Sequence, residues 1–292
     1  MSRHSSKKKK SSNIAKAVRI LILITAFAVF FYALYQILTI RSGYQGAVDE
    51  YTALQESFTS AYDGNSQASS GSEADLPVLT PEEENWLIED ADPPLSVDFA
   101  SLQAINPEIV GWIYIDARPT ISYPILRGSD NDYYLHHTFR GEDNFSGSIF
   151  MEYTNSADFS DPNTIVYGHN MKNQSMFGLL KYLRDQSVYD SAPYFWILTP
   201  EGNYRYHIYA AFETPYDSDA YTLFYGRGDD FLAWEEKMQK NSEVINDVAL
   251  AVSDHTVLLS TCTSDSNIRC VVLGKCVSSA RPPMAKEVPH DS

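Results

Sequence analysis

The hydrophobic pattern of the chain begins with one uninterrupted apolar stretch. Residues 20–40 read ILILITAFAVFFYALYQILTI, 21 positions with no charged side chain. As an α-helix this stretch would be about 31 Å long at ~1.5 Å per residue, which matches the hydrocarbon core of a bilayer. The pattern therefore predicts a transmembrane helix over 20–40.

Charge on either side of that stretch predicts its orientation. Residues 1–19 form a basic tail with seven Lys or Arg and no acid, whereas Arg41 is the nearest charge that follows the apolar stretch. Basic flanks stay on the cytoplasmic side, so we expect the remainder of the chain to lie outside the cell membrane. A cleaved signal peptide is the alternative interpretation, but its apolar core would be about 7–15 residues long and would end at a small-x-small site.

Residues 41–85 have two different patterns. Val48, Tyr51, Leu54, Phe58 and Tyr62 recur at helical intervals, which predicts a juxtamembrane helix that only spaces the domain from the bilayer. Residues 63–84 are rich in Ser, Gly, Asp and Glu, which is typical of a solvated linker.

From residue 86 to residue 277 the pattern changes to short alternating runs. The apolar runs are bounded by turn residues and predict eight strands, with two helices between them, over 176–183 and 229–245. Many short strands with few helices favour a mainly β domain, a closed or nearly closed barrel. The tail over 278–292 contains three prolines and is expected to be loose. The predicted strands are 110–115, 121–126, 147–152, 164–167, 194–198, 204–212, 256–261 and 268–277.

Composition excludes several classes of function. The net charge is -16 despite the basic tail, so the rest of the chain is strongly acidic and no nucleic-acid partner is expected. Three cysteines within fifteen residues are no disulfide framework, and no zinc-ligand or nucleotide-binding spacing accompanies them. We therefore expect no metal and no cofactor.

Cys262 is the first candidate for chemistry. It ends an apolar run and precedes a Thr-Ser-Asp-Ser-Asn turn, so it would lie half-exposed at the lip of a strand. Arg269 begins the next strand, and if the two strands form a hairpin its guanidinium would lower the thiol pKa and stabilise an oxyanion. The alternative is a small buried hydrophobe, which is how we interpret Cys270 and Cys276.

A thiol nucleophile needs a partner that moves protons, usually an imidazole. His169 follows an apolar run in Val-Tyr-Gly-His-Asn, where a strand ends and a loop begins. Position alone leaves it one of three candidate histidines, since Asn170 or a backbone group could fix the ring in a structural role.

Several motifs in register resemble class B sortases. They are TIVYGHNMKNQSMFGLLKYL, LLSTC, the Arg269 strand with VVLGK, INPEIVGWI, YPI, DNDYYL and GSIF, together with the helix near 229–245, and they cover residues 86–277 in the same order. The resemblance implies an eight-stranded sortase β-barrel. It further implies a cysteine transpeptidase that cuts a C-terminal, NPxTN-like sorting signal of secreted proteins after Thr, forms a thioester and transfers the protein to a peptidoglycan-precursor amine.

Carried over by position, the resemblance implies that Cys262 is the nucleophile, His169 the acid/base and Arg269 the group that stabilises the oxyanion. The sorting-signal groove would be lined by Asn131, Leu135, Tyr167, Ser260, Tyr221 and Thr222, and no calcium requirement is implied.

Two departures and three alternatives remain. Leu258 stands where the family has Thr in TLxTC, and the connection from Cys262 to Arg269 is short for class B. The alternatives are a pilin-polymerising or LPxTG-type sortase, a hydrolase that shares the barrel, and a non-catalytic module that binds sorting signals or peptidoglycan.

Overall fold

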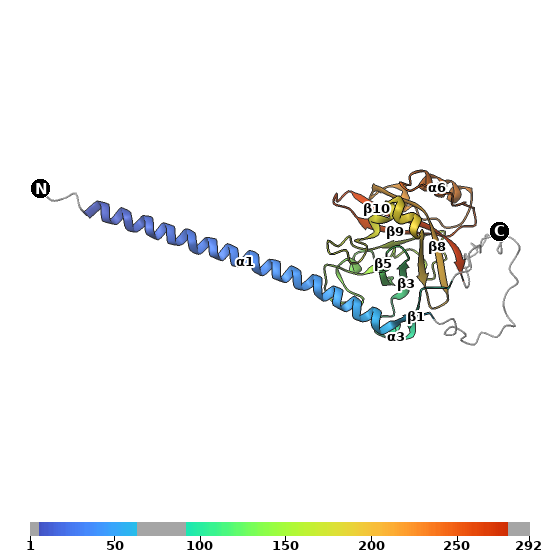
Figure 1. Ribbon diagram of the computed structural model, residues 1–292, viewed down its shortest axis with the longest axis horizontal. Coiled ribbons are helices and arrows are strands. Elements are labelled where there is room, and N and C mark those ends of the chain that lie inside the picture. The colour runs from blue at the N-terminus through green and yellow to red at the C-terminus, as the bar shows by residue number, and fades with distance from the viewer. Residues whose placement is uncertain (1–5, 63–91, 280–292) are drawn as a thin grey trace. The chain divides into compact units, whose positions relative to one another are not determined.

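A computed structural model describes residues 6–62 and 92–279, which form two compact units, Met1–Gly46 and Ala47–Ser292. A single helix, α1 (Ser6–Phe58), contributes to both units (Figure 1). Within it, Val18–Thr39 is long and apolar enough to cross a membrane, by length and composition. The helix predicted over 20–40 is confirmed as a helix, and it is a candidate membrane span.

The last turns of α1 belong to the barrel unit. Tyr51 and Leu54 are buried, at 3% and 2% exposed, and the Tyr51 hydroxyl donates to the Gly147 carbonyl at 3.0 Å. The expectation that this segment only spaces the domain is therefore wrong, because its apolar stripe packs on the barrel. The structure does not describe residues 63–91 or 280–292. The linker predicted over 63–84, the domain start predicted near Trp86 and the loose tail therefore stay predictions.

Eight strands close into a barrel in the order β10-β8-β7-β3-β4-β5-β6-β9, which confirms the predicted fold class. Two neighbouring pairs, β4 with β5 and β6 with β9, are parallel, and the remaining pairs are antiparallel. A two-stranded ribbon, β1 (Thr59–Ala61) with β2 (Leu95–Val97), lies outside the barrel order. The barrel strands are β3 (Ile109–Ile115), β4 (Ser122–Leu126), β5 (Ile149–Met151), β6 (Asn163–Tyr167), β7 (Tyr194–Leu198), β8 (Asn203–Pro215), β9 (Thr256–Cys262) and β10 (Ile268–Ser279).

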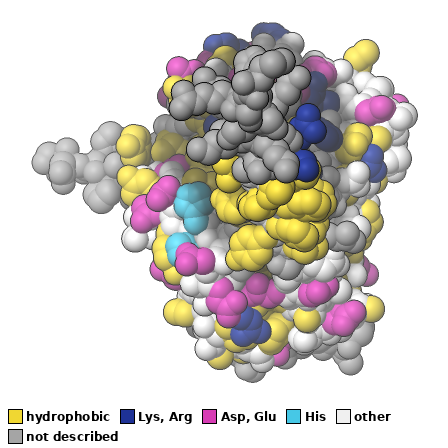
Figure 2. All heavy atoms as spheres, turned by 90° about the vertical axis from the view of Figure 1, so that its left-hand side faces the viewer, with side chains coloured by type: hydrophobic (Ala, Val, Ile, Leu, Met, Phe, Trp, Pro, Cys, Tyr) yellow, Lys and Arg dark blue, Asp and Glu magenta, His cyan; other side chains and the backbone are white. Residues whose placement is uncertain are grey.

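The core fills the barrel because side chains alternate along its strands. In β8, Tyr204, Tyr206 and Ile208 are buried while the residues between them are partly exposed. The face drawn in Figure 2 shows acidic side chains dispersed among polar and apolar ones rather than gathered into one patch.

The helical segments differ most from the sequence-based expectation. The helix predicted over 176–183 is wrong, because Gln174 and Met176 have positive φ (69° and 54°) and the chain turns before a 3-10 helix, η1 (Leu180–Arg184), and a short helix, α5 (Gln186–Ser191). The helix predicted over 229–245 is present as α6 but ends at Lys240. The remaining short helices are α3 (Phe99–Ile105), α4 (Tyr133–His136) and η2 (Asp219–Tyr221).

Candidate active site

Strand register brings Cys262 and Arg269 together. They are direct cross-strand partners in the antiparallel pairing of β9 with β10. Side chains of such a pair leave the same face of the sheet, with Cβ atoms about 4.5–5.5 Å apart. The short connection over residues 263–267 is therefore long enough for a hairpin that sets the two side chains side by side.

The parallel pairing of β6 with β9 brings His169 to the same end of the barrel. Tyr167 pairs with Ser260, and the Gly168 N–H donates to the Ser260 carbonyl at 3.1 Å. A Cβ on Gly168 would lie 2.4 Å from Ile149 Cδ1, so the chain passes where no side chain fits. His169 follows directly, at the point where the strand ends.

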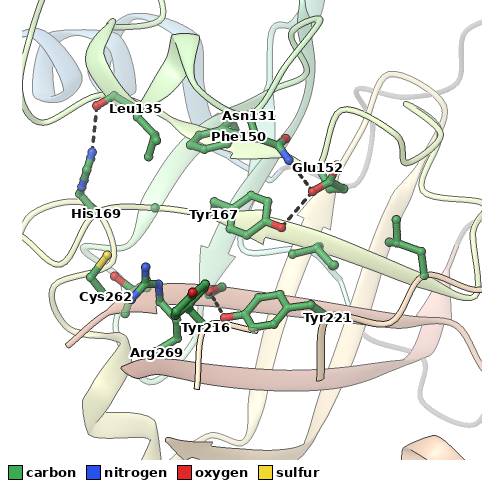
Figure 3. A pocket seen from close by; sticks show the side chains of 15 residues that line it. Asn131, Leu135, Phe150, Glu152, Tyr167, His169, Tyr216, Tyr221, Cys262 and Arg269 are labelled. Carbon is green, nitrogen blue, oxygen red and sulfur yellow. Dashed lines mark hydrogen bonds between the residues drawn. The ribbon is translucent and has the colours of Figure 1, made fainter. Parts of the chain in front are cut away.

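The His169 ring is fixed by a backbone contact. Its Nε2 lies 2.9 Å from the Leu135 carbonyl oxygen (Figure 3). A carbonyl only accepts, so this contact favours the tautomer with a proton on Nε2. In the neutral ring Nδ1 then carries the lone pair, and in the imidazolium the carbonyl stabilises the positive charge.

The hairpin turn between β9 and β10 fixes the Arg269 side chain through hydrogen bonds. Its Nη1 donates to the carbonyls of Ser266 at 2.8 Å and Ile268 at 3.1 Å. The guanidinium carbon lies 5.8 Å from the centre of the Tyr216 ring, within reach of a cation–π contact. These contacts fix the guanidinium group of Arg269 through its Nη1 atom. The Arg269 side chain also lines a cavity.

That cavity has a volume of about 490 Å³, and Cys262, His169 and Arg269 lie together at one end of it (Figure 3). Five of the six residues predicted for a sorting-signal groove line this cavity, namely Asn131, Leu135, Tyr167, Ser260 and Tyr221. Thr222 is not among the lining residues; its carbonyl accepts from Asn163 Nδ2 at 3.0 Å, and its hydroxyl donates to the Asp219 carbonyl. The remaining lining residues are Phe150, Glu152, Ile165, Gly168, Tyr216, Leu223 and Thr261.

Glu152 is the acidic residue among the lining residues that sequence reasoning missed. Its carboxylate, 8% exposed as a residue, accepts from Asn131 Nδ2 and from the Tyr167 hydroxyl, the latter at 3.0 Å (Figure 3). Burial is the largest cause that raises the pKa of Tyr167 far above its ordinary value, and the neighbouring Glu152 carboxylate is the next. The phenol therefore remains a donor. The alternation of the predicted strand over 147–152 contained the signal, since Phe150 and Glu152 share a face.

The opposite wall is also built from donors that keep their protons. The Tyr221 hydroxyl lies 2.8 Å from Ser260 Oγ, and burial raises the pKa of Tyr221 to about 12.

The other two cysteines differ from the partly exposed Cys262. Cys270 and Cys276 are buried, and burial raises the pKa of each thiol to about 12. Both are inert core residues. Within the described ranges 6–62 and 92–279, no three His, Cys, Asp or Glu side chains gather in a way that could hold a metal ion.

Comparison with known proteins agrees with the fold. Residues 113–277 match the family model described as a sortase domain. Sortase B of Listeria monocytogenes is 37% identical over 161 residues, and sortase B of Staphylococcus aureus is 31% identical over 161 residues. Each match covers 54% of this chain, but only 65% and 66% of the respective relative, slightly under two thirds of its length.

Among solved structures, a Staphylococcus aureus sortase B–substrate complex superposes with a TM-score of 0.58 at 31% identity, covering 62% of this chain and 84% of that one. A matched model over more than half of the chain, with this barrel, defines the class of protein: the chain belongs to the sortase family. Its similarity to sortase B proteins from two organisms confirms the class B resemblance seen in the sequence.

Proposed function

We propose that this chain is a cysteine transpeptidase that cleaves the C-terminal sorting signal of secreted proteins after a threonine and transfers them to a cell-wall amine. The observation that carries the proposal is the meeting of a thiol, an imidazole and a guanidinium, Cys262, His169 and Arg269, at one end of one cavity. Membership of the sortase family supports the same chemistry.

In the first half-reaction the Cys262 thiolate attacks the carbonyl carbon of the signal's threonine. The negative charge that develops on the carbonyl oxygen is stabilised by guanidinium N–H groups of Arg269, whose fork is preorganised by the carbonyls below it. When the C–N bond breaks, His169 gives its proton to the leaving amine, and the threonyl carbonyl remains joined to sulfur as a thioester.

In the second half-reaction an amine attacks that thioester. His169 takes the proton from the incoming amine, a new amide forms, and the Cys262 thiolate is released. Transfer rather than hydrolysis requires that the amine outcompete water, and a largely apolar cavity wall formed by Phe150, Ile165 and Leu223 limits water near the thioester.

The cavity continues from the thiol toward Glu152, which supports binding of an extended peptide along it (Figure 3). We assign Asn131, Leu135, Tyr167, Ser260 and Tyr221 to contacts with the sorting signal, for which an NPxTN-like sequence is proposed. The similar structure from Staphylococcus aureus is a sortase B–substrate complex, which supports substrate binding by a barrel of this kind.

Membrane attachment completes the proposal. With Val18–Thr39 as a single-pass anchor and the basic residues 1–19 in the cytoplasm, the barrel unit would lie on the outer face. The proposed acceptor, an amine of a peptidoglycan precursor, would be held at the same membrane, which raises its effective concentration.

The experiment uses the full chain in detergent micelles with fluorogenic NPxTN-type and LPxTG-type peptides, with and without triglycine or a diaminopimelate-containing peptide. Cleavage after threonine and a ligated product are expected, and Cys262→Ala should give neither. Cleavage that yields only the acid in the presence of amine would indicate a hydrolase. Binding without any cleavage would identify a non-catalytic module, and full activity in Cys262→Ala would eliminate the mechanism.

A further inference from the structure

The residue after His169 makes a contact that neither the family motif nor the cavity accounts for. Asn170 Nδ2 donates to the carbonyl oxygen of Cys262 itself at 2.8 Å, across 92 positions of sequence. Asn170 is partly buried and does not line the cavity, so the side chain is aimed at the backbone of the nucleophile rather than at the bound peptide.

This bond lies where the backbone pairing of β6 with β9 stops. Among the described residues the last paired positions are Tyr167 and Ser260, followed by the Gly168 N–H to the Ser260 carbonyl. His169 and Cys262 both lie beyond that point. The Asn170 amide therefore extends the pairing by one further bond, made from a side chain in place of a backbone N–H.

The loop that carries Asn170 is held by several hydrogen bonds. Asn170 forms a β-bridge with Met176, and the Phe177 N–H donates to the His169 carbonyl at 2.9 Å. The Met176 N–H in turn donates to the buried Tyr123 hydroxyl of β4 at 3.0 Å. A closed loop anchored on a third strand thus holds the amide, so a change at Asn170 moves Cys262 and His169 relative to each other rather than only the loop.

From this geometry we propose that Asn170 is a positioning residue for the reaction: its side-chain amide fixes the backbone of Cys262 against the strand end that carries His169. The inference rests on the proposed function, because a thiol and an imidazole that work in succession on one carbonyl must be held in near-attack geometry. An amide–carbonyl bond contributes only about 1 kcal/mol to stability. A misplacement of about 1 Å, by contrast, lowers turnover by about 10²-fold.

The test compares two variants of the full chain in detergent micelles, one isosteric and one that restores a donor. Asn170→Asp replaces the N–H donor by an oxygen that repels the Cys262 carbonyl. Asn170→His restores a donor, because ring Nδ1 is bonded to Cγ as Nδ2 is in asparagine. The matched control is Asn173→Asp in the same exposed loop, where the side-chain oxygen already accepts from Ser175 and is retained.

We expect Asn170→Asp to lower kcat by about 10-fold to 10²-fold with KM nearly unchanged. Asn170→His should recover most of the loss, and Asn173→Asp should match the wild type. Unfolding temperatures measured alongside separate positioning from a merely structural role, which would lower stability without lowering kcat per folded molecule. A wild-type kcat in Asn170→Asp, or equal losses in the Asp and His variants, overturns the inference alone. Absence of cleavage by the wild-type chain overturns the proposed function, and the inference falls with it.

Discussion

The two ends of strand β9 carry polar side chains in opposite settings. At the Cys262 end a thiol, an imidazole and a guanidinium lie around an open cavity. At the Thr256 end, about 20 Å away along the strand at ~3.3 Å per residue, the polar groups are sealed. Glu235, Asp254 and His255 are at most 2% exposed there.

The sealed end is closed by mutual contacts. The Lys275 ammonium lies 3.0 Å from the Asp254 carboxylate and donates to the Ala249 carbonyl at 2.7 Å. The Thr256 hydroxyl donates to Glu235 at 2.7 Å, and burial raises the pKa of that carboxyl to about 8. Burial likewise lowers the pKa of His255 to about 3, so it stays neutral.

This difference shows that the two ends of β9 have separate roles, with stability at the Thr256 end and chemistry at the Cys262 end. At the sealed end the polar groups bond to one another and to backbone: Glu235 links α6 to β9, and Lys275 links β10 to the loop that precedes β9. Groups at the open end are each held through one atom, Nε2 of His169 or Nη1 of Arg269, and keep other atoms toward the cavity. Substitutions at the open end should therefore change turnover, and substitutions at the sealed end should change stability.

The largest effect is expected from His169→Ala at the open end. Without the imidazole neither the leaving amine nor the incoming amine exchanges its proton, so kcat should fall by about 10²–10⁴-fold. Steady-state cleavage of the peptide measures it, with thermal unfolding as the control for folding. Turnover equal to that of the wild type would remove His169 from the mechanism.

Next in size is Lys275→Met at the sealed end. The change leaves the Asp254 carboxylate, 1% exposed as a side chain, without its ion-pair partner, which should lower the free energy of unfolding by about 3–5 kcal/mol. Urea denaturation measures the loss, and turnover per folded molecule should stay the same. The control is the exposed Lys181→Met, for which a change within about 0.5 kcal/mol is expected. Equal stability of the two variants would contradict the comparison.

Arg269→Ala should have a somewhat smaller effect, on turnover alone. Loss of a preorganised donor to the oxyanion lowers kcat by about 10²–10³-fold. Arg118→Ala, a guanidinium 5.5 Å from the Tyr182 ring centre and outside the cavity lining, is the matched control. A loss that appears in KM and leaves kcat intact would assign Arg269 to substrate binding instead.

The last effect is a change in slope rather than a loss at one pH: the pH dependence of stability that Glu235 imposes. Its folded-state pKa, about 8, is raised above the ordinary value of 4.5, so the folded protein holds a proton that the unfolded chain releases. The stability this gives is fully present below pH ~4.5 and is lost as pH rises toward about 8. Glu235→Gln should therefore lose less stability than the wild type between about pH 5 and about pH 8, as measured by urea midpoints. An equal or steeper loss in the variant would show that Glu235 is ionised in the folded protein.

Much of this fold could be predicted because the barrel strands are short apolar or alternating runs bounded by turn residues. The run from Tyr204 to Phe212 lies within β8, and the expected strand over 256–261 is β9 short of one residue. The helix expected over 176–183 could not be excluded from its own pattern, since the Met176 N–H that a helix would use donates instead to the Tyr123 hydroxyl, more than fifty residues away. The N-cap of α3 had a local signal, the Asp98 carboxylate that accepts from the Ser101 N–H, which the alternation pattern did not capture.

The candidate site likewise contains residues that the sequence predicted and residues that it did not. Cys262, His169 and Arg269 lie at strand ends, where turn composition and motif marked them. Glu152 and Asn170 had weaker marks, since alternation only places Glu152 on one face of a predicted strand and the motif around His169 gives Asn170 no defined contact. Their partners, Asn131 and Tyr167 for one and the Cys262 carbonyl for the other, are known only once the strands are paired.

The pairing of Cys262 with Arg269 has a consequence for how such chains can diverge. Register, not the number of residues between them, sets the two side chains on one face. The turn over 263–267 can therefore gain or lose residues as long as the hairpin re-forms in the same alignment. A single insertion inside β9 or β10 would instead rotate one partner to the opposite face of the sheet. Spacing in an alignment is thus a poor guide to this arginine, and strand phase is the quantity to compare.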